Sequence, residues 1–193
     1  EDVAHADASE RNRVAALLFE LFLVELFQLR LVQTDPNFAN YQYNPETGQV
    51  VLLDFGASRR FKAALVRGFR DLLARAIAGD RPGMINAAES IGYQLGPDNS
   101  SYQQTLLELA DIALVPLTVN KLYDFGRSPI PQQLMQRLER LRSNSTFWQV
   151  PPIDVAHIHR KIGGLFMLAT RLDAEINVHE LLLPWLDEYE TAL

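Results

Sequence analysis

The apolar run from Val14 to Leu31, VAALLFELFLVELFQLRL, constrains the fold most, because its surface must be covered either by lipid or by protein. Glu20, Glu25 and Arg30 interrupt this run. Each charge would cost roughly 2.5 to 3.5 kcal/mol near the centre of a bilayer, whereas a helix inside a protein can turn such groups toward its rim. The run therefore predicts a central core helix rather than a membrane span.

Length and charge narrow the possible classes of protein. The 193 residues, 48% of them hydrophobic, can bury one sizeable core but are too few for two ordinary domains. We therefore expect residues 1–193 to form a single compact unit. The formal net charge of -6 and the lack of any run of Lys or Arg argue against nucleic acid as a partner. The chain has no cysteine, so disulfide and thiolate chemistry are excluded.

After the apolar run, the pattern changes from helical periodicity to turn residues and short strand-like runs. Tyr41 to Tyr43 and Val50 to Leu53 read as two strands, and the Pro and Gly of the segment 44–48 favour a tight reversal between them. Amphipathic helices are predicted near residues 62–78, 82–94, 101–122, 131–142, 154–172 and 178–191. The predicted fold is mainly α, with one small β-hairpin against the helices.

Three polar residues around this hairpin have the order and spacing of a phosphoryl-transfer site. Asp35 and Asn40 lie five positions apart in TDPNFAN, and Asp54 begins an Asp-Phe-Gly turn directly after the strand that ends at Leu53. Magnesium prefers oxygen ligands, so Asp54 and the Asn40 amide oxygen could hold it against phosphate oxygens. Asp35 could orient or deprotonate an attacking hydroxyl or water. Each part alone is a common turn, and the combination carries the prediction.

A second Asp-Phe-Gly, at Asp124 to Gly126, serves as an internal control. It follows a predicted helix and has no catalytic-type loop before it. We interpret this copy as a helix stop in which Gly126 is the C-terminal cap, rather than as a metal site.

At these residues the sequence resembles the UbiB-type, aarF-domain, atypical protein-kinase-like family associated with ubiquinone biosynthesis. The run LFLVELFQLRLVQTDPNFANYQYNPETGQVVLLDFGASR is similar to that family's catalytic loop, hairpin and metal loop, and VPPIDVAHIHRKIGGLFMLATRL resembles a later segment. The resemblance implies a protein-kinase-like C-terminal lobe, binding of ATP with Mg²⁺, and an ATPase or unorthodox kinase activity that supports coenzyme Q production at a membrane.

Carried over residue by residue, the resemblance makes Asp35 the catalytic residue and makes Asn40 and Asp54 the metal ligands. Phe55 and Gly56 complete the nucleotide-binding loop with Asn40 and Asp54. The loop departs from ordinary protein kinases, because Gln33-Thr34 replaces His-Arg and no Lys stands two positions after Asp35. Phosphorylation of protein substrates is therefore not expected.

The later segment contains the run His159-Arg160-Lys161 followed by the pair Gly163-Gly164. Consecutive helix positions point about 100° apart and do not converge on one ligand. We therefore assign the three basic residues a structural or interface role. The glycine pair is expected to allow close packing of a helix.

No strand-rich small lobe with its Lys is recognisable before Asp35, so we expect the N-terminal lobe to be absent and this lobe alone to be inactive or nearly so. The expected partners are that missing lobe and lipid-biosynthesis proteins or a membrane surface. The expected location is the bacterial cytoplasm, peripheral to the inner membrane, with the matrix side of the mitochondrial inner membrane as the alternative. Two other functions remain open: a small-molecule phosphotransferase of aminoglycoside or choline kinase type, and a non-catalytic pseudokinase-like scaffold.

Overall fold

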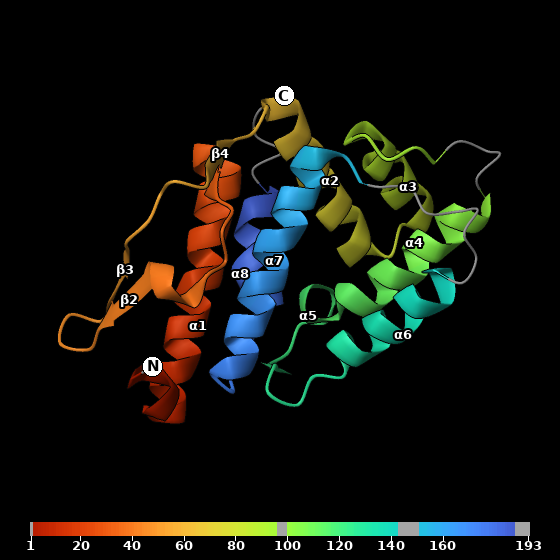
Figure 1. Ribbon diagram of the computed structural model, residues 1–193. Coiled ribbons are helices and arrows are strands. Elements are labelled where there is room, and N and C mark those ends of the chain that lie inside the picture. The colour runs from red at the N-terminus through yellow and green to blue at the C-terminus, as the bar shows by residue number, and fades with distance from the viewer. Residues whose placement is uncertain (1, 96–99, 143–150, 188–193) are drawn as a thin grey trace.

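The computed structural model describes residues 2–95, 100–142 and 151–187, and helices dominate these ranges (Figure 1). The strands form three separate antiparallel pairs. The mainly α prediction is confirmed.

Helix α1, Ala8–Leu23, is the central helix that the apolar run predicted, and it packs against α7 and α8 (Figure 1). Asp7 caps its N-terminus by accepting a hydrogen bond from the Glu10 backbone N–H at 2.9 Å. The helix continues as a π-helical segment, Val24–Leu29, which ends at Arg30 in the left-handed conformation with φ 54°. Leu18, Leu26 and other apolar side chains of this run are buried. No helix among the described residues is long and apolar enough to cross a membrane.

The remaining helices are α2 Ala63–Ala78, α3 Arg81–Ser90, α4 Ser100–Ala113, α5 Val115–Thr118, α6 Ile130–Arg142, α7 Ile153–Arg171 and α8 Val178–Asp187, with short 3-10 turns at Asp2–His5 and Phe38–Asn40. They follow the sequence pattern except over 101–122 and at the end of α3, which stops at Ser90 rather than at 94. Positions 188–191 of the predicted last helix lie outside the described residues. The predicted continuous helix over 101–122 is wrong: it breaks after residue 113, resumes in α5 and ends at Thr118. Pro116 lies in that stretch and cannot donate the hydrogen bond that a continuous helix needs, so the chain breaks into α4 and the short α5.

The predicted hairpin is confirmed as β2, Tyr41–Asn44, paired with β3, Gln49–Leu52. Gly48 in the turn has φ 68°, a conformation that glycine adopts without strain. Two further pairs were not predicted: β1, Leu31–Gln33, pairs with β4, Ser58–Arg60, and β5, Tyr123–Asp124, pairs with β6, Glu175–Ile176. The β1–β4 pair brings the segments on either side of the hairpin together.

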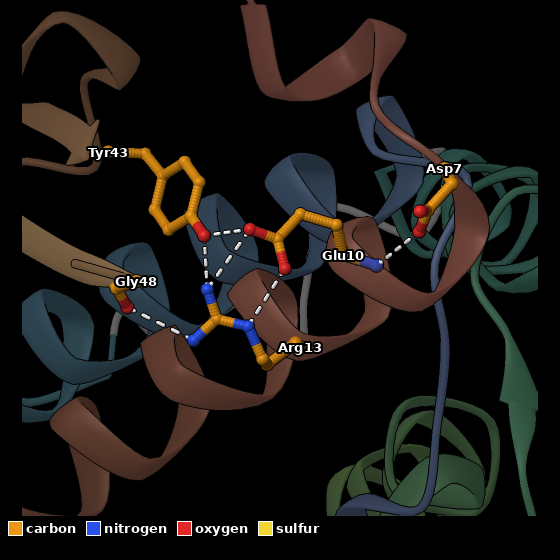
Figure 2. A network of polar contacts seen from close by, with 5 residues as sticks. All are labelled: Asp7, Glu10, Arg13, Tyr43 and Gly48. Carbon is orange, nitrogen blue, oxygen red and sulfur yellow. Dashed lines mark hydrogen bonds and ion pairs between the residues drawn. The ribbon is translucent and has the colours of Figure 1, made fainter. Parts of the chain in front are cut away.

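A polar network fastens the hairpin to α1 (Figure 2). The Arg13 guanidinium donates to the Gly48 carbonyl oxygen at 3.0 Å and pairs with the Glu10 carboxylate at 2.9 Å. The Tyr43 hydroxyl donates to the same carboxylate and accepts from Arg13. The strands that lie between Asn40 and Asp54 are therefore held on the first turns of α1.

The second Asp-Phe-Gly is not a helix stop, so that interpretation was wrong. Helix α5 ends at Thr118, and Asp124 lies in β5. Phe125 is 1% exposed and contacts the rings of three other aromatic residues, Phe19, Tyr123 and Phe166. Gly126 does not cap a helix; it lies against Asp173, whose exposed carboxylate would have to move if a Cβ were added there.

Candidate functional site

The loop after β1 and the loop after β3 are hydrogen-bonded to each other. The Thr34 backbone N–H and hydroxyl both donate to the Ala57 carbonyl oxygen, at 3.2 and 2.8 Å. The Gln33 side-chain amide donates to the backbone carbonyl of Asp54 at 3.4 Å. These bonds hold the segment that leads into Asp35 beside the segment that carries Asp54.

Asp35 and Asn40 are in direct contact, as the spacing predicted for residues of one site. The Asn40 side-chain amide donates to Oδ2 of Asp35 at 3.0 Å, and Asn40 is 8% exposed. Oδ1 of Asp35 accepts a hydrogen bond from the Arg160 guanidinium, also at 3.0 Å. Both carboxylate oxygens are therefore engaged, and the Asp35 side chain is fixed in orientation.

Asp54 is exposed at the other edge of the site. Its Oδ1 accepts a hydrogen bond from the Gly56 backbone N–H at 2.7 Å, and this bond closes a tight turn. Phe55, between them, is 62% exposed. Within the described residues, the Asp54 carboxylate has no hydrogen bond to Asp35 or Asn40, so its backbone rather than its side chain connects it to them.

Asn40 and Asp54 offer oxygen atoms of the kind that a magnesium ion binds. Because the Asn40 amide nitrogen is committed to Asp35, its oxygen is the atom left for a cation, and Oδ2 of Asp54 supplies a carboxylate oxygen. Mg²⁺ takes such hard oxygen ligands and completes its shell with water and substrate phosphates. The part of the chain that the structure describes has no cluster of three or more His, Cys, Asp or Glu residues that could hold a metal.

Helix α7 contacts the loop that carries Asp35 and Asn40, and the sequence did not predict these contacts. Its Arg160 binds Asp35, and its Lys161 donates to the Tyr41 hydroxyl at 2.8 Å. Arg160 and Lys161 point in different directions from α7, and each meets a different part of the segment 35–41. The run His159-Arg160-Lys161 was visible in the sequence, and only the tertiary fold shows that two of its members contact the loop.

The glycine pair in α7 divides into one packed and one free position. A Cβ on Gly164 would lie 1.8 Å from Cβ of Pro36, which directly follows Asp35. A Cβ on Gly163 would have no neighbour within 4 Å. Close packing is therefore confirmed for Gly164 only, and it is the loop rather than another helix that requires it.

Lys161 also forms a buried ion pair below the loop. Its Nζ lies 3.4 Å from Oε2 of Glu25, with side-chain exposures of 1% and 8%. Burial raises the pKa of the Glu25 carboxyl, against the opposing effects of the Lys161 charge and of a hydrogen bond from the Gln33 backbone.

Comparisons with known proteins identify similar chains. Residues 1–88 match the family model of the ABC1 atypical kinase-like domain. The chain is 30% identical over 171 residues to atypical kinase COQ8B, mitochondrial, of Rattus norvegicus, covering 89% of this chain and 32% of that protein. It is 29% identical over 178 residues to atypical kinase COQ8, mitochondrial, of Saccharomyces cerevisiae, covering 91% and 35%. The chain thus spans about a third of the length of these relatives.

A solved structure has the same fold. Rv3197 of Mycobacterium tuberculosis, determined in complex with erythromycin, matches with a TM-score of 0.67 over 93% of this chain and 44% of that one, at 20% identity. The kinase-like fold expected from the sequence is confirmed. The curated relatives named above are mitochondrial, which agrees with the alternative location and gives no support to the expected bacterial cytoplasm.

Proposed function

Because this chain belongs to the UbiB-type family of ABC1 atypical kinase-like proteins, we propose that it carries the catalytic and metal loops of an enzyme that binds Mg-ATP. The enzyme would hydrolyse or transfer the terminal phosphoryl group in support of ubiquinone biosynthesis. The observation that carries the proposal is the Asn40–Asp35 hydrogen bond beside the Asp-Phe-Gly loop, because it orients the amide oxygen for a cation.

In this proposal each residue has a separate task. Asn40 and Asp54 would hold Mg²⁺, which neutralises charge on the phosphate oxygens. Asp35 orients the attacking water or hydroxyl, and Arg160 keeps its carboxylate in place. The bond from the terminal phosphorus to the bridging oxygen breaks as the attacking oxygen bonds to phosphorus. The proton of the attacking group passes to Asp35 or to solvent.

The proposal includes a partner over the site. Val51, Leu53 and Phe55 are 43%, 50% and 62% exposed, so apolar surface lies open next to Asp54. The N-terminal lobe of a kinase-like protein would cover such a surface and supply the other half of the phosphate site. We place the whole protein on the matrix side of the mitochondrial inner membrane, at a membrane surface or beside lipid-biosynthesis proteins.

The test compares the two Asp-Phe-Gly sequences in the longest natural chain that contains these residues. Asp54→Asn should weaken Mg-dependent ATP binding and slow hydrolysis by more than about tenfold. Asp124→Asn is the matched control, since in the described part of the chain its carboxylate contacts Arg127 alone, whose backbone N–H donates to Oδ1 at 2.9 Å. Equal activity in Asp54→Asn and wild type would refute the metal assignment. A wild-type protein that neither binds nor hydrolyses ATP would support the scaffold reading instead.

A further inference from the structure

A buried ion pair lies directly below the loop that carries Asp35 and Asn40. Lys161 is 1% exposed and Glu25 is 6% exposed, so both charged groups are removed from water. Removing two ions from water costs several kcal/mol each, on the order of what their mutual attraction returns. Stability alone therefore gives little reason for an ion pair at this position.

The contacts of the pair connect it to both ends of the loop. The Gln33 backbone, two residues before Asp35, lies close enough to the Glu25 carboxylate to lower its pKa. The Lys161 ammonium donates to the hydroxyl of Tyr41, the residue directly after Asn40, at 2.8 Å. Because Glu25 and Lys161 also bind each other, the two ends of the loop are joined through one buried contact.

The elements that supply the pair lie far apart in the sequence. Glu25 comes from the π-helical segment Val24–Leu29, and Lys161 comes from α7. π-helical turns are rare and often occur at functional sites. The π-helical segment and α7 therefore both contribute to the buried contact that adjoins the loop carrying Asp35 and Asn40.

We propose that Glu25 and Lys161 are positioning residues that clamp both ends of the loop and so set the separation between the Asp35 carboxylate and the Asn40 amide oxygen. The consequence for catalysis rests on the proposed function, because misplacement by about 1 Å can reduce a rate on the order of 100-fold. The clamp itself concerns only this chain and can be measured without nucleotide.

Tyr41→Phe is the sharpest variant, since it removes only the hydroxyl that receives Lys161. Tyr43→Phe is the matched control, because it removes a hydroxyl from the same strand. The partners of that hydroxyl, Glu10 and Arg13, belong to α1 and not to the ion pair. Hydrogen exchange of the Asn40 and Leu53 backbone amides, which bond to Asn37 and Asn40 respectively, reports on the loop. Exchange should accelerate about tenfold in Tyr41→Phe and stay near wild type in Tyr43→Phe.

A double variant separates positioning from stability. Lys161→Met alone leaves Glu25 unpaired and should destabilise the fold, whereas Lys161→Met with Glu25→Gln removes both charges and should restore much of the melting temperature. If the pair positions the loop, the double variant still exchanges its Asn40 amide fast and binds Mg-ADP at least about tenfold more weakly than wild type.

The outcomes separate the clamp from the proposed function. Unchanged exchange at Asn40 in Tyr41→Phe, or wild-type exchange in the double variant, would overturn the clamp whether or not nucleotide binds. Absence of Mg-nucleotide binding in the wild type would instead overturn the proposed function, and the exchange results would still decide the clamp.

Discussion

Phe55 and Phe125 occupy the same place in the two Asp-Phe-Gly sequences of this chain, and their environments are opposite. Phe55 is 62% exposed on the rim of the candidate site, whereas Phe125 is 1% exposed among aromatic rings in the core. The tripeptide therefore does not specify an environment, which depends on the segments around it.

Phe125→Ala should lower the free energy of unfolding by about 3 to 5 kcal/mol, because it leaves a cavity in the core. Phe55→Ala should change it by less than about 1 kcal/mol, because that ring is mostly in solvent. Denaturant unfolding of both variants checks this. Similar losses in the two variants would contradict the assignment of the second copy to the core.

Substitutions at the glycine pair should have opposite effects on stability. Gly163→Ala should stabilise the protein by about 0.5 to 1 kcal/mol, since alanine is the better helix former and the position is open. Gly164→Ala should destabilise it by about 1 to 3 kcal/mol, because the new methyl group overlaps Pro36. Thermal and denaturant unfolding give both numbers.

Gly164→Ala should also weaken Mg-nucleotide binding, since Pro36 must move and Asp35 is its neighbour. If Gly164→Ala were as stable as Gly163→Ala, the close approach of α7 to the loop would be wrong.

Arg160→Gln should separate turnover from stability. The Arg160–Asp35 pair is partly solvent-exposed, at 60% and 32%, so its loss should change the free energy of unfolding by no more than about 1 kcal/mol. Turnover should fall by about 10-fold or more, because one oxygen of Asp35 loses the partner that orients it. Steady-state ATP hydrolysis and denaturant unfolding measure the two effects.

Arg127→Gln is the control for Arg160→Gln. The Arg127 side chain is 89% exposed and, among the described residues, pairs only with Asp124, at 3.9 Å, so neither turnover nor stability should change. Equal turnover in Arg160→Gln and Arg127→Gln would remove Arg160 from the site.

Stability in the acid range should depend on Glu25. Burial raises the pKa of its carboxyl above the ordinary value of 4.5, so the folded protein retains this proton to higher pH than the unfolded chain does. The contribution of protonated Glu25 to the free energy of unfolding is present in full below pH 4.5 and is lost as pH rises through the raised pKa. Glu25→Gln should remove this part of the fall in the free energy of unfolding with rising pH.

Denaturant unfolding between pH ~4 and ~7 measures the slope of the free energy of unfolding against pH. Glu20→Gln, on the exposed side of α1, is the control and should keep the wild-type slope. A slope in Glu25→Gln equal to that of wild type would show that Glu25 is not the group responsible.

Local patterns predicted the parts of the fold that depend on local chemistry. The central helix, the hairpin and most helix positions follow from apolar periodicity and turn residues, and Asp35 and Asn40 meet because five positions of loop bring them together. The pairs β1–β4 and β5–β6 were missed because strands of three and two residues contain no measurable alternation.

The contacts of Arg160 and Lys161 were missed for a different reason. More than a hundred residues separate them from the loop, at Asp35 and Tyr41, and no local pattern records that distance. The prediction of a helix stop at Asp124 failed because the preceding helical run already ends at Thr118, where Val119 turns extended.

The π-helical segment Val24–Leu29 makes this protein more sensitive to changes in length than to changes in side chain. A π-turn contains about one residue more than an α-turn. A residue inserted or deleted without a compensating change in this turn would rotate the downstream chain by about 100°. Glu25 would no longer face Lys161, and Asp35 would enter its loop out of register. We expect homologous chains to vary in composition across this stretch while the number of residues between Glu25 and Asp35 stays constant.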